Sequence, residues 1–240
     1  MSVNCECMNS ELMQYGVLPE LCALKLFSEF SELEVKSLCQ GGKVIVNDHR
    51  KVLFKAGSKA DFFFVILSGA FKLVRQTLQG DDAIIHFSGP GDVLGALILT
   101  QRNPLYPISA ISMGPSRALK IPKANYSCWK DNPTLVFRIQ NLLSNRMVSL
   151  QQQKVLNKSS LQAKMANLLI ELAELQSTNS QQTIPIPLTR KEIADTVGAS
   201  VESIIRIMSD WSKKGYVVTN DKQITILKSS KLIEFMGAEI

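Results

Sequence analysis

LTRKEIADTVGASVESIIRIMSDWSKKGYVVTNDKQITIL, residues 188–227, is the stretch that decides the fold of the C-terminal part of the chain. Thr189 and Glu192 have the spacing of a capping box, and Ser200 is a favoured residue for the N-cap of a second helix. Gly198, between the two helices, supplies the positive φ that ends a helix. Two short β-prone runs follow the second helix. The pattern therefore predicts a winged helix-turn-helix, which presents its second helix to the major groove of duplex DNA.

The second predicted helix has one apolar and one polar side. Its buried stripe is expected to contain Ile204, Ile207, Met208 and Trp211. An arginine on the other side can pair with guanine O6 and N7, and a glutamate can accept from cytosine N4. The alternative is a surface ion pair between Glu202 and Arg206, which contributes only about 0.2–0.5 kcal/mol. The complete helix-turn-helix and wing favours base contact. The predicted base-reading residues are Val201, Glu202, Ser203 and Arg206, and the predicted phosphate contacts are Thr189, Arg190, Ser200, Lys213, Lys214 and Lys222.

The charge of the chain permits a polyanionic partner. The 240 residues carry a net charge of +6, with a pI near 9.1. From Lys158 to the end, however, ten Lys and Arg stand against nine Asp and Glu, so phosphate contacts have to come from a few placed groups. The longest apolar run, 62–67, is too short to span a bilayer, and the N-terminus lacks the pattern of a secretory signal. A cytoplasmic protein with no membrane partner is expected.

Neither a metal site nor a catalytic site is expected. The five cysteines are an odd number and imply no disulfide framework; Cys5 and Cys7 have poor spacing for zinc or an iron–sulfur cluster. Free thiols are expected, with Cys39 and Cys128 buried. The two histidines, His49 and His86, are expected to be structural. No nucleophile triad, carboxylate pair or phosphate loop is recognisable, so we do not expect an enzyme.

The N-terminal half predicts a β domain, and a long helix follows it. Short β-prone runs separated by Gly- and Pro-containing turns extend over 42–121, which is typical of an antiparallel barrel or jelly roll. Pro133 opens a helical stretch whose apolar positions include Ile139, Leu143, Met147 and Leu150. A parallel two-helix dimer seam is the favoured use for that surface, and packing onto its own barrel is the alternative. The predicted class is α+β, with a β-roll sensor and N-terminal helices at 1–131, a dimerisation helix at 132–157 and the winged helix-turn-helix at 158–240.

This order of elements resembles the CRP/FNR family, named after the cyclic-AMP receptor protein and the fumarate-nitrate reductase regulator. The resemblance covers about residues 24–227. It is carried by the strand-like stretches 52–57 and 64–69, the glycines of 91–95, Asn132-Pro133, and the helix-turn-helix at 188–206. It implies a homodimeric transcription regulator with RNA polymerase as a partner. It also implies a palindromic site with a TGA core in each half, read by Glu202 and Arg206.

The signal that would control such a regulator is not given by the sequence. The family position for an effector maps to Gly91, Asp92, Gly95, Ala96 and Tyr106. Cyclic-nucleotide binders carry glutamate where Ala96 stands and an Arg-Ser or Arg-Thr pair near Tyr106-Pro107, so cyclic AMP in the usual mode is disfavoured. An iron–sulfur cluster is disfavoured because Cys5 and Cys7 lack a close third cysteine. Haem is left open, although no residue calls for it.

Three inputs therefore stay open: another small ligand, a thiol or metal signal, or no effector. A different class also stays open, because the C-terminal segment is nearly neutral. It is a ligand-binding or protein-interaction module whose helix-turn-helix does not read DNA.

Overall fold

The chain divides into two compact units. The computed structural model describes residues 16–77, 82–156, 158–175, 182–184 and 186–237. One unit contains Met1–Gly69 and Gly89–Ser144, and the other contains Ala70–Ser88 and Asn145–Ile240. A segment of the N-terminal half, Ala70–Ser88, thus belongs to the same compact unit as the C-terminal helices. The division of the chain at 131 and 157 stays a prediction.

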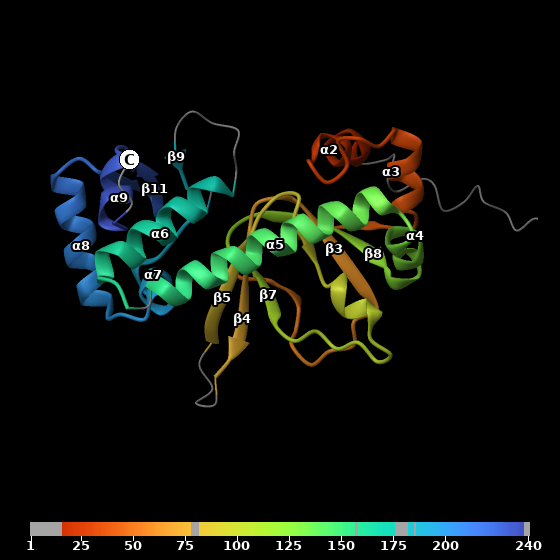
Figure 1. Ribbon diagram of the computed structural model, residues 1–240, viewed down its shortest axis with the longest axis horizontal. Helices are drawn as coiled ribbons and strands as arrows, with labels where there is room; N and C mark the ends of the chain where they lie inside the picture. Colours follow the sequence, from red (N-terminus) through yellow and green to blue (C-terminus); the bar gives the residue numbers. More distant parts are fainter. Residues whose placement is uncertain (1–15, 78–81, 157, 176–181, 185, 238–240) are drawn as a thin grey trace, which may run out of the picture. The chain divides into compact units, whose positions relative to one another are not determined.

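The first unit is the predicted antiparallel β-roll (Figure 1). One of its sheets has the strand order β1-β8-β3-β6, and β2 pairs with β7. The central strand β3 is buried on both faces, which is why its sequence is continuously apolar rather than alternating. The strands are β1 (Lys43–Asn47), β2 (Val52–Phe54), β3 (Phe62–Ser68), β6 (Val93–Leu94), β7 (Ser109–Ser112) and β8 (Ser116–Pro122).

Short helices accompany the roll: α2 (Val17–Ala23), α3 (Glu32–Leu38), α4 (Tyr126–Lys130) and the 3-10 turns η1 (Leu97–Thr100) and η2 (Lys123–Asn125). Ser31 caps α3 through a capping box with Glu34. Trp129 of α4 is fully buried, with its ring edge-to-face against Phe27 and Phe63. Its Nε1 donates to the Leu38 carbonyl at 2.9 Å. This aromatic cluster fixes α3 and α4 to the sheet.

The thiols agree with the prediction in part. Cys22, Cys39 and Cys128 are free, and Cys39 is buried as expected. Burial, followed by the neighbouring Cys22, raises the pKa of the Cys39 thiol to about 12, so this thiol stays protonated. The prediction that Cys128 is buried was wrong, because α4 turns Trp129 inward and leaves Cys128 exposed. Cys5 and Cys7 lie outside the described residues.

The second unit contains the predicted helix-turn-helix and wing. The segment Ala70–Ser88 forms the hairpin β4 (Phe71–Gln76) and β5 (Asp82–Ser88). The C-terminal part contains α6 (Leu161–Glu174), α7 (Arg190–Val197), α8 (Val201–Lys213) and a further helix α9 (Ser229–Phe235). Its sheet, β10-β11-β9, joins β9 (Gln182–Thr183), β10 (Val217–Asn220) and β11 (Gln223–Ile226). Its core includes the fully buried Met165, Leu169, Leu172, Ile204 and Trp211.

A single long helix, α5 (Pro133–Leu156), follows the roll, as predicted (Figure 1). Asn132 Oδ1 accepts from the Leu135 amide at 3.1 Å and so caps it. Of the predicted dimer positions, Ile139 and Leu143 are half-buried, whereas Met147 is 59% and Leu150 37% exposed. The α5 helix therefore retains uncovered apolar surface in a single copy of the chain. In the part that the structure describes, no helix combines the length and hydropathy that a membrane crossing requires.

Candidate nucleic-acid interface

The N-terminus of α7 is closed by the predicted capping box. The Thr189 hydroxyl accepts from the Glu192 amide at 3.1 Å, and Glu192 Oε2 accepts from the Thr189 amide at 3.1 Å and from its hydroxyl at 2.9 Å. Two amides of the helix N-terminus are thus satisfied, which fixes the direction in which the chain enters the helix. Thr189 and Arg190 are therefore held at a defined helix end.

The turn between α7 and α8 also forms as predicted. Gly198 ends α7 with a φ of 70°, and its amide donates to the Ala194 carbonyl. A side chain at Gly198 would meet no atom within 4 Å, so glycine is required by the backbone conformation and not by space. Ser200 caps α8 by accepting from the Ser203 amide at 3.3 Å. The turn between the two helices is therefore set by two local signals, the end of α7 at Gly198 and the start of α8 at Ser200.

Helix α8 has the two faces that a reading helix needs. Its buried stripe is the predicted one, Ile204, Ile207, Met208 and Trp211. Glu202 and Arg206 are exposed, as predicted, whereas Val201 and Ser203 are half-buried at the first turn. Ile205 and Ser209 are exposed on the same side, because positions 202, 205, 206 and 209 follow helical spacing. Ile205, 49% exposed, is the residue that sequence reasoning missed. The signal was present, because Ile205 lies between the two predicted readers and outside the buried stripe.

The two charged side chains on this face, Glu202 and Arg206, do not pair with each other. Hydrogen bonds from its own backbone amide and from Ser200 lower the pKa of Glu202, so its carboxylate stays an acceptor. Among the described residues, Arg206 forms no ion pair with Glu202, in contrast to the surface-pair alternative. Both side chains are therefore available to a ligand that approaches α8 from solvent.

The four basic residues among the predicted phosphate contacts fall into two groups. Lys213 and Lys222 are exposed, and Lys222 adopts a φ of 68° in the two-residue turn of the wing. Lys214 pairs with Asp210 at 2.9 Å, and Arg190 is half-buried and donates from Nη2 to Thr219 Oγ1 of β10 at 3.2 Å. Burial lowers the pKa of Arg190. The second group has protein partners that a phosphate would have to share or replace.

The head, which comprises α6 to α9 and the sheet β10-β11-β9, is stabilised around α8 by the wing, β10 and β11, and by α9. Asp221 and Lys222 both have positive φ, the geometry of a type I′ hairpin, and Asn220 faces Gln223 across the turn. The Trp211 indole of α8 stacks on Phe235 of α9, with ring centroids 5.2 Å apart and an interplanar angle of 18°. The last helix therefore packs against the buried stripe of the reading helix and leaves its polar face open.

The predicted effector positions lie in a loop whose backbone conformation depends on two glycines. This loop lies beside an aromatic cluster in the first unit. Gly91 and Gly95 have φ values of 87° and 80°, and a Cβ on Gly95 would lie 3.0 Å from the Tyr106 ring. Tyr106 is buried; its hydroxyl donates to the Phe62 carbonyl at 2.6 Å. Asp92 accepts from an amide of its own loop at 3.0 Å, and Ala96 is buried. The structure brings these residues together, but the side chain of Ala96 has no polar group for a ribose hydroxyl.

The Tyr106 phenol is held in the neutral form. Burial is the main cause that raises its pKa to about 12. The ring also stacks on Phe54 with centroids 4.2 Å apart, so it belongs to the core of the roll.

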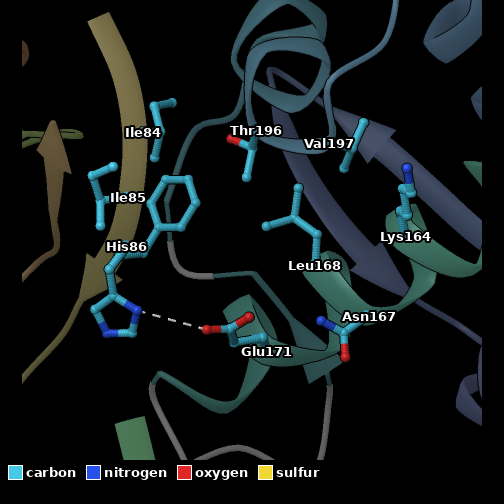
Figure 2. A pocket seen from close by; sticks show the side chains of 10 residues that line it. Ile84, Ile85, His86, Lys164, Asn167, Leu168, Glu171, Thr196 and Val197 are labelled. Atoms are coloured by element: carbon cyan, nitrogen blue, oxygen red, sulfur yellow. Dashed lines mark ion pairs between the residues drawn. The ribbon is translucent and has the colours of Figure 1, made fainter. Parts of the chain in front are cut away.

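A cavity of about 220 Å³ lies within the second unit, between the β4–β5 hairpin and the helices α6 and α7 of the head (Figure 2). Side chains from β5, α6 and α7 face one another across it. His86 Nδ1 lies 3.8 Å from Glu171 Oε1, and burial followed by the charge of Arg146 lowers the pKa of His86 to about 3. The imidazole is therefore neutral at physiological pH. The lining residues are Ile84, Ile85, His86, Phe87, Lys164, Asn167, Leu168, Glu171, Thr196 and Val197.

Comparison with known proteins agrees with this architecture. A family model described as "Crp-like helix-turn-helix domain" matches residues 163–235, and one described as "Cyclic nucleotide-binding domain" matches residues 48–127. The fumarate and nitrate reduction regulatory protein of Vibrio cholerae is 30% identical over 192 residues, which are 77% of this chain and 75% of that protein. The chain belongs to the CRP/FNR family of transcription regulators. Another similar protein is the CRP-like cAMP-activated global transcriptional regulator of Mycobacterium tuberculosis, 25% identical over 75% of this chain and 82% of that protein.

Solved structures show the same fold for this CRP/FNR-family chain. FixK2 from Bradyrhizobium japonicum superposes with a TM-score of 0.70 at 15% identity, over 83% of this chain and 99% of that one. A CRP-family transcriptional regulator from Thermus thermophilus gives a TM-score of 0.65 at 19% identity, over 81% and 97% of the two chains. The named relatives are transcription regulators and not enzymes. The predicted fold class and regulator function are confirmed.

Proposed function

We propose that this regulator binds DNA as a homodimer and reads a palindromic site with a TGA core in each half. The observation that carries the proposal is the exposed face of α8, where an ionised glutamate and an arginine that does not pair with it lie one turn apart. Arg206 would pair with guanine O6 and N7, and Glu202 would accept from cytosine N4. Val201 and Ser203 lie at the first turn of the same helix, where recognition helices contact base edges.

Ile205 joins this set as an apolar reader. Its side chain lies between Glu202 and Arg206 on the exposed face, and aliphatic groups recognise thymine through its C5-methyl group. We expect one thymine in each half-site to be preferred over uracil for this reason.

Dimerisation would place two α8 helices about 34 Å apart, one turn of B-DNA. The exposed Met147 and Leu150, with the half-buried Ile139 and Leu143, supply the apolar surface that a second α5 would cover. Leu150→Glu should therefore give a monomer by sedimentation velocity and lose tight binding to the palindrome. Gln152→Glu, which adds the same charge at an exposed polar position of the same helix, is the matched control.

The input is proposed to differ from cyclic AMP in the usual mode. Ala96 stands where an acidic side chain would hold the ribose, and Tyr106 contributes its ring and its hydroxyl to the core. Cytoplasmic location remains a prediction from the sequence, and contact with RNA polymerase remains a prediction from the family resemblance.

Fluorescence anisotropy tests the proposal with a labelled TGA palindrome and a scrambled duplex, each with and without cyclic nucleotides and reductant. We expect salt-dependent binding that prefers the palindrome. Arg206→Ala should cost about 1–3 kcal/mol of binding free energy and relax specificity at one base pair. A uniform loss on every duplex would make Arg206 a phosphate contact. Equal, weak binding to both duplexes in all conditions would favour the interaction-module alternative.

A further inference from the structure

The capping carboxylate of α7 is shared with a residue from the N-terminal half of the chain. Glu192 Oε2 caps the helix through Thr189, while Glu192 Oε1 lies 3.0 Å from Lys72 Nζ of β4. The two partners are separated by 120 residues. Both are largely buried, with side chains 16% exposed for Lys72 and 7% for Glu192. The hairpin therefore holds the same group that sets the start of the helix-turn-helix.

The charge of Glu192 depends on this arrangement. Burial alone would raise the pKa of Glu192, but hydrogen bonds from Thr189 and Lys72 outweigh it and leave the pKa below its ordinary value. The carboxylate is thus ionised while it is buried. A buried charge of this kind is tolerated only with a partner, and Lys72 is that partner.

A cavity interrupts the contact between the β4–β5 hairpin and the helices of the head. The cavity of about 220 Å³ separates β5 from parts of α6 and α7 (Figure 2). At its edge the His86–Glu171 contact is 3.8 Å long and involves a neutral imidazole. Where this cavity separates them, β5 and the two helices do not pack against one another. The Lys72–Glu192 pair is a short contact between full charges beside this gap.

We propose that Lys72 is a positioning residue for DNA binding, which fixes the N-terminus of α7 by holding Glu192. The inference rests on the proposed function, because Thr189 and Arg190 at this helix end are the predicted phosphate contacts. Lys72 itself touches no DNA in this scheme. Through this pair, a displacement of the hairpin changes the presentation of the phosphate-binding end of the head.

Substitutions at both ends of the pair test the proposal. Lys72→Met removes the ammonium and keeps an unbranched side chain, whereas Lys72→Arg keeps the charge. Lys72→Met/Glu192→Gln removes both charges, and glutamine still serves as the third residue of a capping box. Arg75→Met removes one positive charge from an exposed position of the same strand and is the matched control. Two measurements are made on each full-length variant: anisotropy on the TGA palindrome and the scrambled duplex, and hydrogen exchange of the peptide that covers 189–197.

We expect Lys72→Met to weaken binding between about 2-fold and 30-fold, the range typical of residues that couple sites without touching the ligand. The factor should be similar for both duplexes, because phosphate contacts carry no sequence information. Exchange in 189–197 should rise in the free protein. Lys72→Arg should bind within about 2-fold of the wild type, because it keeps the charge that holds Glu192. The double variant should be weakened like Lys72→Met, because it keeps the cap of α7 but no longer ties that cap to β4.

The proposal is overturned if Lys72→Met binds DNA as tightly as the wild type or more tightly, whatever its exchange, or if Arg75→Met has the same effect. If Lys72→Met does not fold, the double variant and Lys72→Arg provide the test. Binding by the double variant as tight as that of the wild type, or a loss of binding by Lys72→Arg, would also overturn the proposal. Failure of the proposed function looks different, since the wild type itself would then bind both duplexes equally and weakly. The exchange measurement needs no DNA, and unchanged exchange in Lys72→Met would still reject the positioning role.

Discussion

The neutral histidine beside the cavity predicts a loss of stability in mild acid. His86 has a folded-state pKa of about 3, because burial and the nearby charge of Arg146 oppose protonation, whereas an unfolded chain protonates histidine near pH 6.5. Between these two values the unfolded state binds a proton that the folded state does not. The stability of the second unit must therefore fall as the pH is lowered from about 6.5 towards 3.

The size of the effect follows from the two pKa values. At pH 5 the solution is about 1.5 units below the unfolded value and still above the folded one, and each unit corresponds to about 1.36 kcal/mol. The expected loss from His86 is therefore about 2 kcal/mol between pH 7.5 and 5. The side chain is only 17% exposed, so solvent screening reduces this little.

Urea unfolding at the two pH values measures the loss. Trp129 and Trp211 are the two tryptophans of the chain, and Trp129→Phe leaves Trp211 to report on the second unit alone. In that background, His86→Gln should lose about 2 kcal/mol less than the parent when the pH falls to 5. His49→Gln, at an exposed turn, is the matched control. If His86→Gln and the parent lose the same amount, a neutral buried imidazole is the wrong description.

Three further substitutions test how the head is built, each measured by urea unfolding with Trp211 or circular dichroism as the probe. Gly198→Ala should cost about 1–2 kcal/mol from backbone strain alone, since its φ is 70° and no atom lies near the added Cβ; a stabilised variant would contradict this. Thr189→Ala should cost about 0.5–2 kcal/mol through the lost cap, and Thr189→Ser should restore most of it. Trp211→Ala should cost about 3–5 kcal/mol, because the indole is fully buried against α9, and a cost below about 1 kcal/mol would refute that packing.

The features predicted correctly from sequence are local ones. Each of three signals depends on residues within one turn: the capping box at Thr189, the turn at Gly198 and the cap at Ser200. The helix-turn-helix could therefore be located from the amino-acid sequence alone. The strand β6 has only two residues, too few for any period to be visible. Cys128 was placed wrongly because burial in so short a helix depends on which side Trp129 takes.

Other features depend on partners that are distant in sequence. Lys72 and Glu192 are separated by 120 residues, and neither has a neighbour in sequence that indicates the other. The β4–β5 hairpin likewise belongs to the second unit through contacts with residues that are distant in sequence. Ile205 was missed for a different reason, because a large aliphatic residue within a helix is typical of a core position. Ile205 is recognised as a candidate base contact only when the buried positions of α8 are known, because they leave it on the opposite side of the helix.

The same structure limits how strongly salt can weaken DNA binding. Four basic side chains per head are candidates for phosphates: Arg190, Lys213, Lys214 and Lys222. Two heads could neutralise at most about eight phosphates, which corresponds to a slope of log K against log salt near −7. Arg190 already donates to Thr219, and Lys214 is paired with Asp210, so both have to exchange a protein partner for a phosphate. If only the other two contribute, the slope falls to about −4. A measured slope between these limits would agree with phosphate contacts by these four residues, whereas a steeper slope would require further basic residues, such as the exposed Lys191 of α7.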